Sequence, residues 1–251
     1  MMIVVVTRKG DLVAERFVAH ARARGVGARQ VIAWREVSLA IASTREGDLA
    51  LGLHLTEVPG PISAILNRMP PTPLDPSPDE RFRASEGAAA WWSALAAFQG
   101  PVLNRPDPRG YLPPIHLPGF GARLLGLEQA PSTLASRPPP DRGGIAMHVH
   151  TLAHPIVRET AAPTGGAILR YSPAGPIARL LVAGRHAFPL DHSPWLSPPQ
   201  PPREAPLFAV LTLALGEAGA RLVCADPVPR WEDYAHLADS VHDALLEALA
   251  A

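Results

Sequence analysis

The densest group of potential metal ligands in this sequence is a set of histidines in the segment MHVHTLAH. If residues 148–151 are extended, His148 and His150 lie on one face of a strand, as paired imidazole ligands would. His154 follows four residues later and could complete a zinc or iron site. The alternative is a half-exposed strand with solvent-facing histidines, because no second cluster of ligands accompanies it.

A second chemical pattern is a polar pair that ends two apolar runs. ILNR delivers Asn67 and Arg68, and VLNRP delivers Asn104 and Arg105. In a doubly wound sheet the carboxyl ends of parallel strands line the ligand crevice. The two pairs would then form a cationic rim suited to a carboxylate or phosphate. The alternative interpretation is that they are the solvated starts of two loops.

A third pattern is an apolar run that stops in a rigid turn with one carboxylate. The run over 220–225 ends in Asp226-Pro227-Val228-Pro229 just before a polar helix. Such a turn could present a metal or phosphate ligand. Cys224, within the apolar run, is expected to be a small inert hydrophobe.

The elements that must position these residues follow a β-α-β order. A β-branched run over 2–6, an amphipathic helix over 11–25 and a strand over 29–34 predict a parallel, doubly wound sheet. Further predictions are a hairpin over 37–55, strands over 62–68 and 101–106, and helices over 79–98, 207–219 and 234–251.

Composition excludes several functional classes. Formal net charge is zero and pI is about 7.2, so the chain lacks the basic field that nucleic acid or an anionic membrane requires. One cysteine rules out an internal disulfide framework, and no run approaches the ~20 apolar residues of a membrane span. A cytoplasmic location is the resulting expectation.

The order of segments resembles the ATP-grasp ligases of the glutathione-synthetase and ribosomal-protein-modifying (RimK-like) type. The likeness lies in PISAILNRMPPTPL, a helix with an internal Glu86, the Asn-Arg-Pro strand, GLEQAPST over 126–133, and IARLLVAGRHAFPLD, which places Arg179 at the family's arginine. The resemblance implies an α/β fold: an N-terminal doubly wound, pre-ATP-grasp-like domain over 1–118, then a shortened ATP-grasp-like α+β domain over 119–251.

Departures from the family concern its chemistry. The resemblance implies two ATP-binding lysines, but no lysine follows Lys9, and the span from Thr133 to Arg179 is short. Where the family's Glu-x-Asn motif holds magnesium, this chain has Cys224 and Asp226. The segment before them, interpreted as a helix, leaves no room for the hairpin that supplies a further Asp. We therefore expect Asp226 to cap or brace the last helix.

These departures predict a catalytically degenerate binding or accessory subunit in peptide modification or cofactor biosynthesis, with no cofactor. Its ligand-binding residues would be the Asn-Arg rim and Arg179, and its partner a protein, a second copy or a small acidic ligand. One alternative is a divergent ATP- and Mg²⁺-dependent carboxylate–amine ligase, with Arg158, Arg170 or Arg179 on phosphate and Asp226 and Glu159 on magnesium. Another is a metal-dependent enzyme built on His148, His150 and His154.

Overall fold

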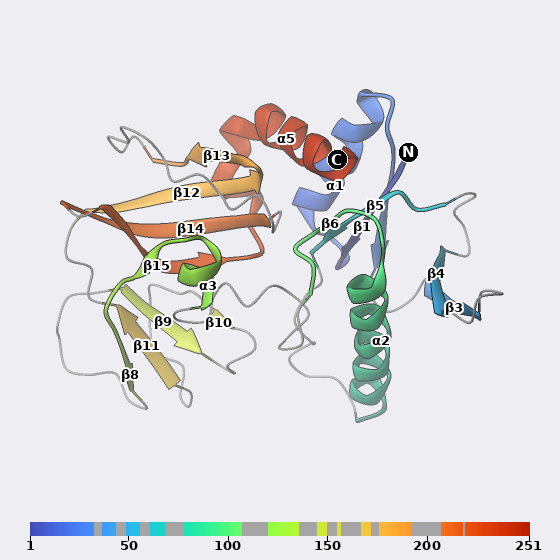
Figure 1. Cartoon of the computed structure of the whole chain (residues 1–251), viewed down its shortest axis with the longest axis horizontal. Helices are drawn as coiled ribbons and strands as arrows, with labels where there is room; N and C mark the ends of the chain where they lie inside the picture. The colour runs from blue at the N-terminus through green and yellow to red at the C-terminus, as the bar shows by residue number, and fades with distance from the viewer. Residues whose placement is uncertain are drawn as a thin grey trace. The chain divides into compact units, whose positions relative to one another are not determined.

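The computed structural model describes residues 1–32, 37–43, 49–55, 61–68, 78–106, 120–135, 145–149, 155–156, 167–171, 176–191, 207–217 and 219–251. The chain divides into two compact units. The first combines residues 1–113 with 230–251, and the second comprises residues 114–229. In Figure 1 the red C-terminal helix accordingly lies beside the blue N-terminal helix. This division differs from a boundary after residue 118, because the C-terminal segment returns to the first unit.

The first unit is built on a four-stranded parallel sheet in the order β2-β1-β5-β6. The strands are β1 (Met2–Thr7), β2 (Gly27–Ile32), β5 (Ala64–Asn67) and β6 (Val102–Leu103). Buried β-branched and leucine side chains fill these strands, as expected for a sheet covered on both faces. The predicted doubly wound parallel sheet is confirmed.

Helices cover this sheet from two sides. Helix α1 (Leu12–Ala23) connects β1 to β2, and α2 (Pro78–Ala97) lies between β5 and β6 in the chain. The two crossovers run in opposite directions across the sheet, so right-handed connections place the helices on opposite faces. Helix α2 supplies Trp91 and Leu95 to a core with Val4, Val6 and Ile65.

The C-terminal segment adds a second helix beside α1. It consists of α4 (Trp231–Tyr234), a 3₁₀ turn η1 (Ala235–Leu237) and α5 (Ala238–Ala250), and α5 contacts α1, β5 and β6. The predicted hairpin is also present: β3 (Val37–Ser43) pairs antiparallel with β4 (Leu49–Leu55).

The second unit contains a five-stranded sheet in the order β13-β12-β14-β15-β7. Its long strands are β12 (Ile177–Gly184), β14 (Leu207–Gly216) and β15 (Gly219–Asp226), with β13 (His186–Pro189) and β7 (Glu128–Gln129) at the edges. Helix α3 (Phe120–Leu124) is adjacent, and Ala122 and Leu125 join the aliphatic core on one face of this sheet.

The prediction of a helix over 207–219 was wrong, because most of this run is strand β14. Leu and Ala favour helix by propensity, and a continuous apolar run has no period that separates a buried strand from a buried helix. Strand β14 pairs with β12 on one side and β15 on the other, so tertiary pairing overrides propensity. The hairpin for which no room was expected therefore exists, with Gly216 opposite Gly219, whose φ is 116°.

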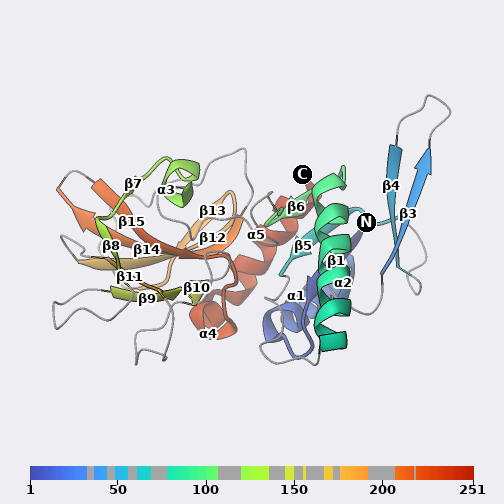
Figure 2. The same ribbon diagram turned by 90° about the horizontal axis from the view of Figure 1, so that it is seen from below.

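A further four-stranded sheet in the second unit has the order β10-β9-β11-β8. It comprises β8 (Ser132–Ala135), β9 (Ile145–Val149), β10 (Pro155–Ile156) and β11 (Ala167–Tyr171), all antiparallel to their neighbours. Figure 2 shows it as a layer distinct from the β12–β15 sheet. Among the described residues, no helix is both long and apolar enough to cross a membrane.

Candidate functional site

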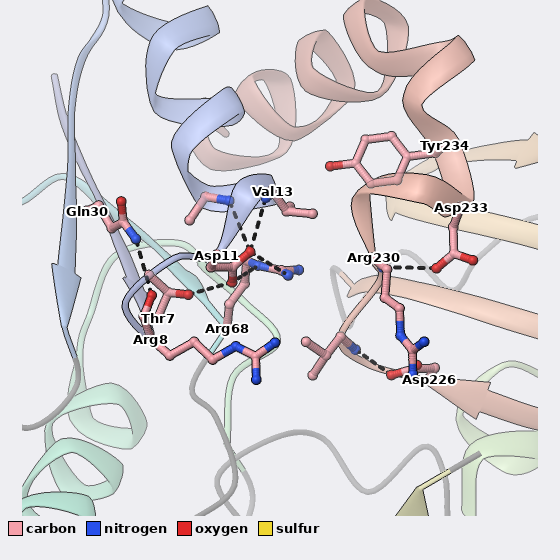
Figure 3. A network of polar contacts seen from close by, with 12 residues as sticks. Thr7, Arg8, Asp11, Val13, Gln30, Arg68, Asp226, Arg230, Asp233 and Tyr234 are labelled. Atoms are coloured by element: carbon pink, nitrogen blue, oxygen red, sulfur yellow. Dashed lines mark hydrogen bonds and ion pairs between the residues drawn. The ribbon is translucent and has the colours of Figure 1, made fainter. Parts of the chain in front are cut away.

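At the carboxyl end of the parallel sheet, Arg68 forms a buried ion pair. Its Nε donates to Asp11 Oδ2 at 2.9 Å and a terminal nitrogen donates to Asp11 Oδ1 at 3.1 Å (Figure 3). Exposure of the two side chains is 3% and 8%. Val6 lies opposite Asn67 in the sheet register, so Arg68 leaves β5 close to the end of β1, where Asp11 begins α1.

Asp11 caps the start of α1 in addition to pairing with Arg68. Its carboxylate accepts hydrogen bonds from the backbone N–H groups of Val13 and Ala14, the arrangement of a helix N-cap, and from the Thr7 hydroxyl. Burial by itself raises the pKa of Asp11, but the Arg68 guanidinium and these hydrogen bonds outweigh it. The pKa of the carboxyl is therefore held below its ordinary value, and Asp11 stays charged.

The second Asn-Arg pair is also engaged inside the first unit. Asn104 is fully buried with a φ of 58°, and its carbonyl accepts a hydrogen bond from the Asn67 side chain at 2.8 Å. The Arg105 guanidinium donates to the carbonyls of Leu95, Ala96 and Phe98 and, at 2.8 Å, to that of Gly100. Arg105 thus caps the C-terminal end of α2.

The structure brings Asn67 and Asn104 together as predicted for adjacent strand ends. Arg68 and Arg105, however, each bind groups of their own domain. The sequence does contain a signal for the missed partner of Arg68: Asp11 precedes the apolar stripe of a helix, which marks an N-cap.

A row of polar side chains crosses the β12-β14-β15 sheet in the second unit. Arg179 lies opposite Thr212, and Thr212 lies opposite Cys224, so all three share one face. Asp226 follows two residues after Cys224 on the same face. Leu181 and Val210, the next residues along that face, are buried. Thr212 was missed at the sequence level because its strand was interpreted as a helix.

Burial determines the chemistry of Cys224. The side chain is 5% exposed, and burial raises the pKa of its thiol to about 11, against a smaller lowering effect from a hydrogen bond with Thr212. The group is therefore a neutral thiol at physiological pH.

The resemblance implies magnesium at this row, and the donor set does not fit that ion. Mg²⁺ prefers several hard oxygen ligands in octahedral geometry, normally including carboxylates. The row offers a hydroxyl, a neutral thiol and the single carboxylate of Asp226, with the Arg179 guanidinium on the same face. A neutral thiol is a soft donor and a guanidinium repels a dication.

Asp226 has a local structural contact. Its Oδ1 accepts a hydrogen bond from the Val228 N–H at 2.8 Å, which closes an Asx turn at the start of the Pro227–Pro229 segment (Figure 3). At the start of α4, the carboxylate of Asp233 accepts from the Arg230 N–H at 2.9 Å. The expectation that Asp226 braces the start of the last helix stays a prediction; its carboxylate holds the turn that leads into α4.

The remaining candidates are only partly within the described residues. His148 lies in β9, opposite Ile156 and Ile168, whereas His150, His154, Arg158 and Glu159 lie outside the described residues. Over the described ranges, no group of three or more His, Cys, Asp or Glu side chains is placed to hold a metal ion. Arg179 donates its backbone N–H to Asp191 at 2.8 Å, which fastens β12 near its start.

Comparison with known proteins gives a consistent fold. No family model and no curated protein matches the sequence. Among solved structures, the ATP-grasp ligase PsnB complexed with minimal precursor, Mg and ADP is similar at a TM-score of 0.60 and 15% identity, over 98% of this chain and 97% of that one. The macrocyclase MdnC from Microcystis aeruginosa, bound with precursor peptide MdnA, aligns at a TM-score of 0.61 and 14% identity, over 98% and 100%.

A third similar structure is a RiPP-associated ATP-grasp ligase from Chryseobacterium gregarium, in complex with ADP and a leader and core peptide. It aligns at a TM-score of 0.58 and 10% identity, over 99% of this chain and 96% of that one. At these identities the likeness establishes the fold: the chain has the ATP-grasp fold. The expected α/β architecture is confirmed.

Proposed function

We propose that this chain is an ATP-grasp-fold protein that binds a peptide or protein partner in a peptide-modification pathway and does not itself carry out ATP-driven ligation. The observation that supports this most directly is the row of Arg179, Thr212, Cys224 and Asp226. Phosphoryl transfer depends almost wholly on cations placed around the γ-phosphate. A row with one carboxylate and a neutral thiol has little means of holding the magnesium ion that such transfer uses.

The proposal of a peptide as the binding partner rests on the similar structures. PsnB, MdnC and the Chryseobacterium protein are each described with a precursor, leader or core peptide bound. An accessory subunit with the same fold retains a peptide-binding role when the ligation chemistry is lost. Peptide binding thus accounts for an ATP-grasp fold whose row of Arg179, Thr212, Cys224 and Asp226 does not suit magnesium.

Within the proposed binding surface, Arg179 is the residue we assign to an acidic group of the ligand. Its side chain is partly exposed on the sheet face, whereas Arg68 is 3% exposed against Asp11 and Arg105 binds four carbonyls of its own unit. The role of the other rim residues is then to shape the ends of β5 and β6; these are Asn67, Arg68, Asn104 and Arg105. A carboxylate on the ligand would be recognised by the guanidinium without a bridging metal.

Calorimetry with ATP, at matched concentrations with and without Mg²⁺, tests the absence of ligase chemistry. We expect no magnesium-dependent heat of binding and no ADP formation when a precursor peptide is added. Magnesium-dependent ATP binding accompanied by peptide-dependent ADP release would reject the proposal.

Peptide binding is tested separately, by fluorescence anisotropy with labelled MdnA, the precursor peptide bound to MdnC. Arg179→Gln should weaken binding, while Arg185→Gln, an exposed arginine in the β12–β13 turn, should leave it unchanged. Equal effects of the two substitutions would remove Arg179 from the site.

A divergent active ligase is the second candidate, and one observation favours it. The alignments extend over 97% of PsnB, whose structure contains Mg and ADP, so the fold that binds them is present here almost throughout its length. In that case Arg158, Arg170 or Arg179 would contact phosphate, and Glu159 with Asp226 would hold magnesium. The calorimetric experiment distinguishes the two candidates directly.

A further inference from the structure

His242 of α5 lies inside an aromatic cluster of the first unit. Its ring faces Phe17 and His20 of α1 at centroid separations of 5.8 and 5.2 Å. Trp231 and Tyr234 of α4 approach it at 6.1 and 5.9 Å. The residue is 2% exposed. One imidazole thus joins the three helices α1, α4 and α5.

His242 shares a buried hydrogen bond with Tyr234. Tyr234 Oη lies 3.4 Å from His242 Nε2. Burial raises the pKa of Tyr234 well above its ordinary value, so the hydroxyl keeps its proton. Either neutral tautomer of His242 can form this hydrogen bond, because the hydroxyl can donate or accept.

The surroundings disfavour a charge on His242. Burial and, to a smaller extent, the neighbouring His20 lower its pKa to about 4. Asp239 and Asp243 act in the opposite direction, but both lie toward solvent, with side-chain exposures of 93% and 45%. Protonation would therefore place a cation in a buried cluster of aromatic rings, while the two carboxylates that favour the charge lie toward solvent.

Other polar groups around the cluster have partners of their own. His20 Nε2 lies 2.8 Å from Asp243 Oδ1, and Arg24 donates to Asp243 Oδ2 at 2.8 Å. The remaining charged groups near the cluster are Arg16, whose guanidinium lies 5.7 Å from the Trp231 ring, and the Asp11, Arg68 and Asp233 side chains, which act on Tyr234. Arg68 and Asp11 form their own buried ion pair, and Asp233 accepts from the Arg230 N–H. His242, 2% exposed against 12% for the His20 side chain, is therefore the more buried of the two imidazoles in the cluster.

We propose that the C-terminal segment formed by α4 and α5 is a proton-sensitive anchor, docked on α1 while His242 is neutral and released when His242 is protonated. In the released segment the imidazole is hydrated and recovers its ordinary basicity. The docked state therefore binds the proton more weakly than the released state, and acid favours release.

The direction and size of this pH effect follow from the difference between the docked-state and released-state pKa values of His242. The docked-state pKa of about 4 lies below the ordinary 6.5, so the stabilisation is complete above pH 6.5 and is lost as pH falls toward 4. Between pH 7.5 and pH 5.0 the equilibrium between released and docked segment should shift roughly 30-fold toward release.

Hydrogen exchange on the full chain tests the anchor, with amide rates at each pH divided by the intrinsic rates. We expect protection over 238–250 to fall roughly 30-fold from pH 7.5 to pH 5.0. Protection of β1 should change far less, because the sheet core remains covered by α2. Equal losses in α5 and β1 would show a general loss of domain stability and overturn the anchor.

Two substitutions at position 242 keep the experiment decisive. His242→Phe fills the aromatic cluster without a titrating group, and His242→Gln retains an acceptor for Tyr234 should the first variant not fold. Either should abolish the pH dependence of α5 protection. His20→Gln, which leaves His242 in place, should retain it. Persistence of the pH dependence in a folded His242 variant would overturn the proposal.

Discussion

Thr212 of β14 lies directly opposite Cys224 of β15, and Arg179 of β12 lies opposite Thr212 on its other side. This cross-strand row fixes what the sheet face can bind. Asp226 lies on the same face, and its Oδ1 already accepts the Val228 N–H. A thiol, a hydroxyl and a guanidinium recognise organic anions better than they recognise a hard dication.

Cys224 should be unreactive in the folded protein. Burial raises its pKa to about 11, so at pH 7.5 the thiolate fraction is roughly 100-fold smaller than for an exposed cysteine. Iodoacetamide labelling followed by intact-mass measurement should show alkylation at least about 100-fold slower in buffer than in urea. Because the chain has one cysteine, every added label reports on this site. Rapid labelling of the native protein would contradict the structure.

Loss of either partner of the Asp11–Arg68 pair should be severe. Arg68→Met leaves a buried carboxylate without its guanidinium, which typically costs about 3–5 kcal/mol of unfolding free energy. Asp11→Ala should cost at least as much, because the N-cap of α1 is lost with it. Urea denaturation measures both effects.

The matched control for that pair is the exposed bridge between Arg221 and Glu128, with side-chain exposures of 43% and 75%. Arg221→Gln should change the unfolding free energy by less than about 1 kcal/mol, since solvent screens an exposed pair. Comparable losses at the two sites would mean that Asp11–Arg68 is solvated in solution.

Arg105 should be required for the stability of the first unit. Arg105→Gln removes charged donors from four carbonyls at the end of α2, and hydrogen bonds to a charged group contribute about 1.5–3 kcal/mol. We expect a loss of roughly 2 kcal/mol by urea denaturation. A variant with unchanged stability but weakened peptide binding would instead place Arg105 in the ligand site.

Asp226 distinguishes a turn residue from a metal ligand. Asp226→Asn keeps an Oδ1 acceptor for the Val228 N–H, so the melting temperature should stay nearly unchanged. Asp226→Ala removes the acceptor and should cost about 1 kcal/mol. Both should be insensitive to added Mg²⁺ in thermal denaturation. A magnesium-dependent stabilisation of wild type that disappears in Asp226→Asn would establish a metal site here.

Much of the first unit could be predicted from local patterns. The β-branched run of β1, the amphipathic stripe of α1 and the polar ends of β5 and β6 each depend on neighbours in sequence, and the βαβ rule arranges them into a parallel sheet. The order of segments also led to the ATP-grasp fold. The N-cap pattern marks Asp11, but it does not show that Arg68, 57 residues away, pairs with it. The carbonyl partners of Arg105 likewise depend on tertiary packing.

The sequence by itself determined which side chains are available to this protein: no lysine after Lys9, one cysteine, and a single carboxylate beside it in the C-terminal turn. Only the tertiary structure decided what those side chains do. Pairing with strands on both sides made 207–216 a strand and so placed Thr212 opposite Cys224. Return of the C-terminal helix to α1 buried His242 among aromatic rings. Both outcomes depend on contacts between residues far apart in the chain, whose free energies exceed local propensity.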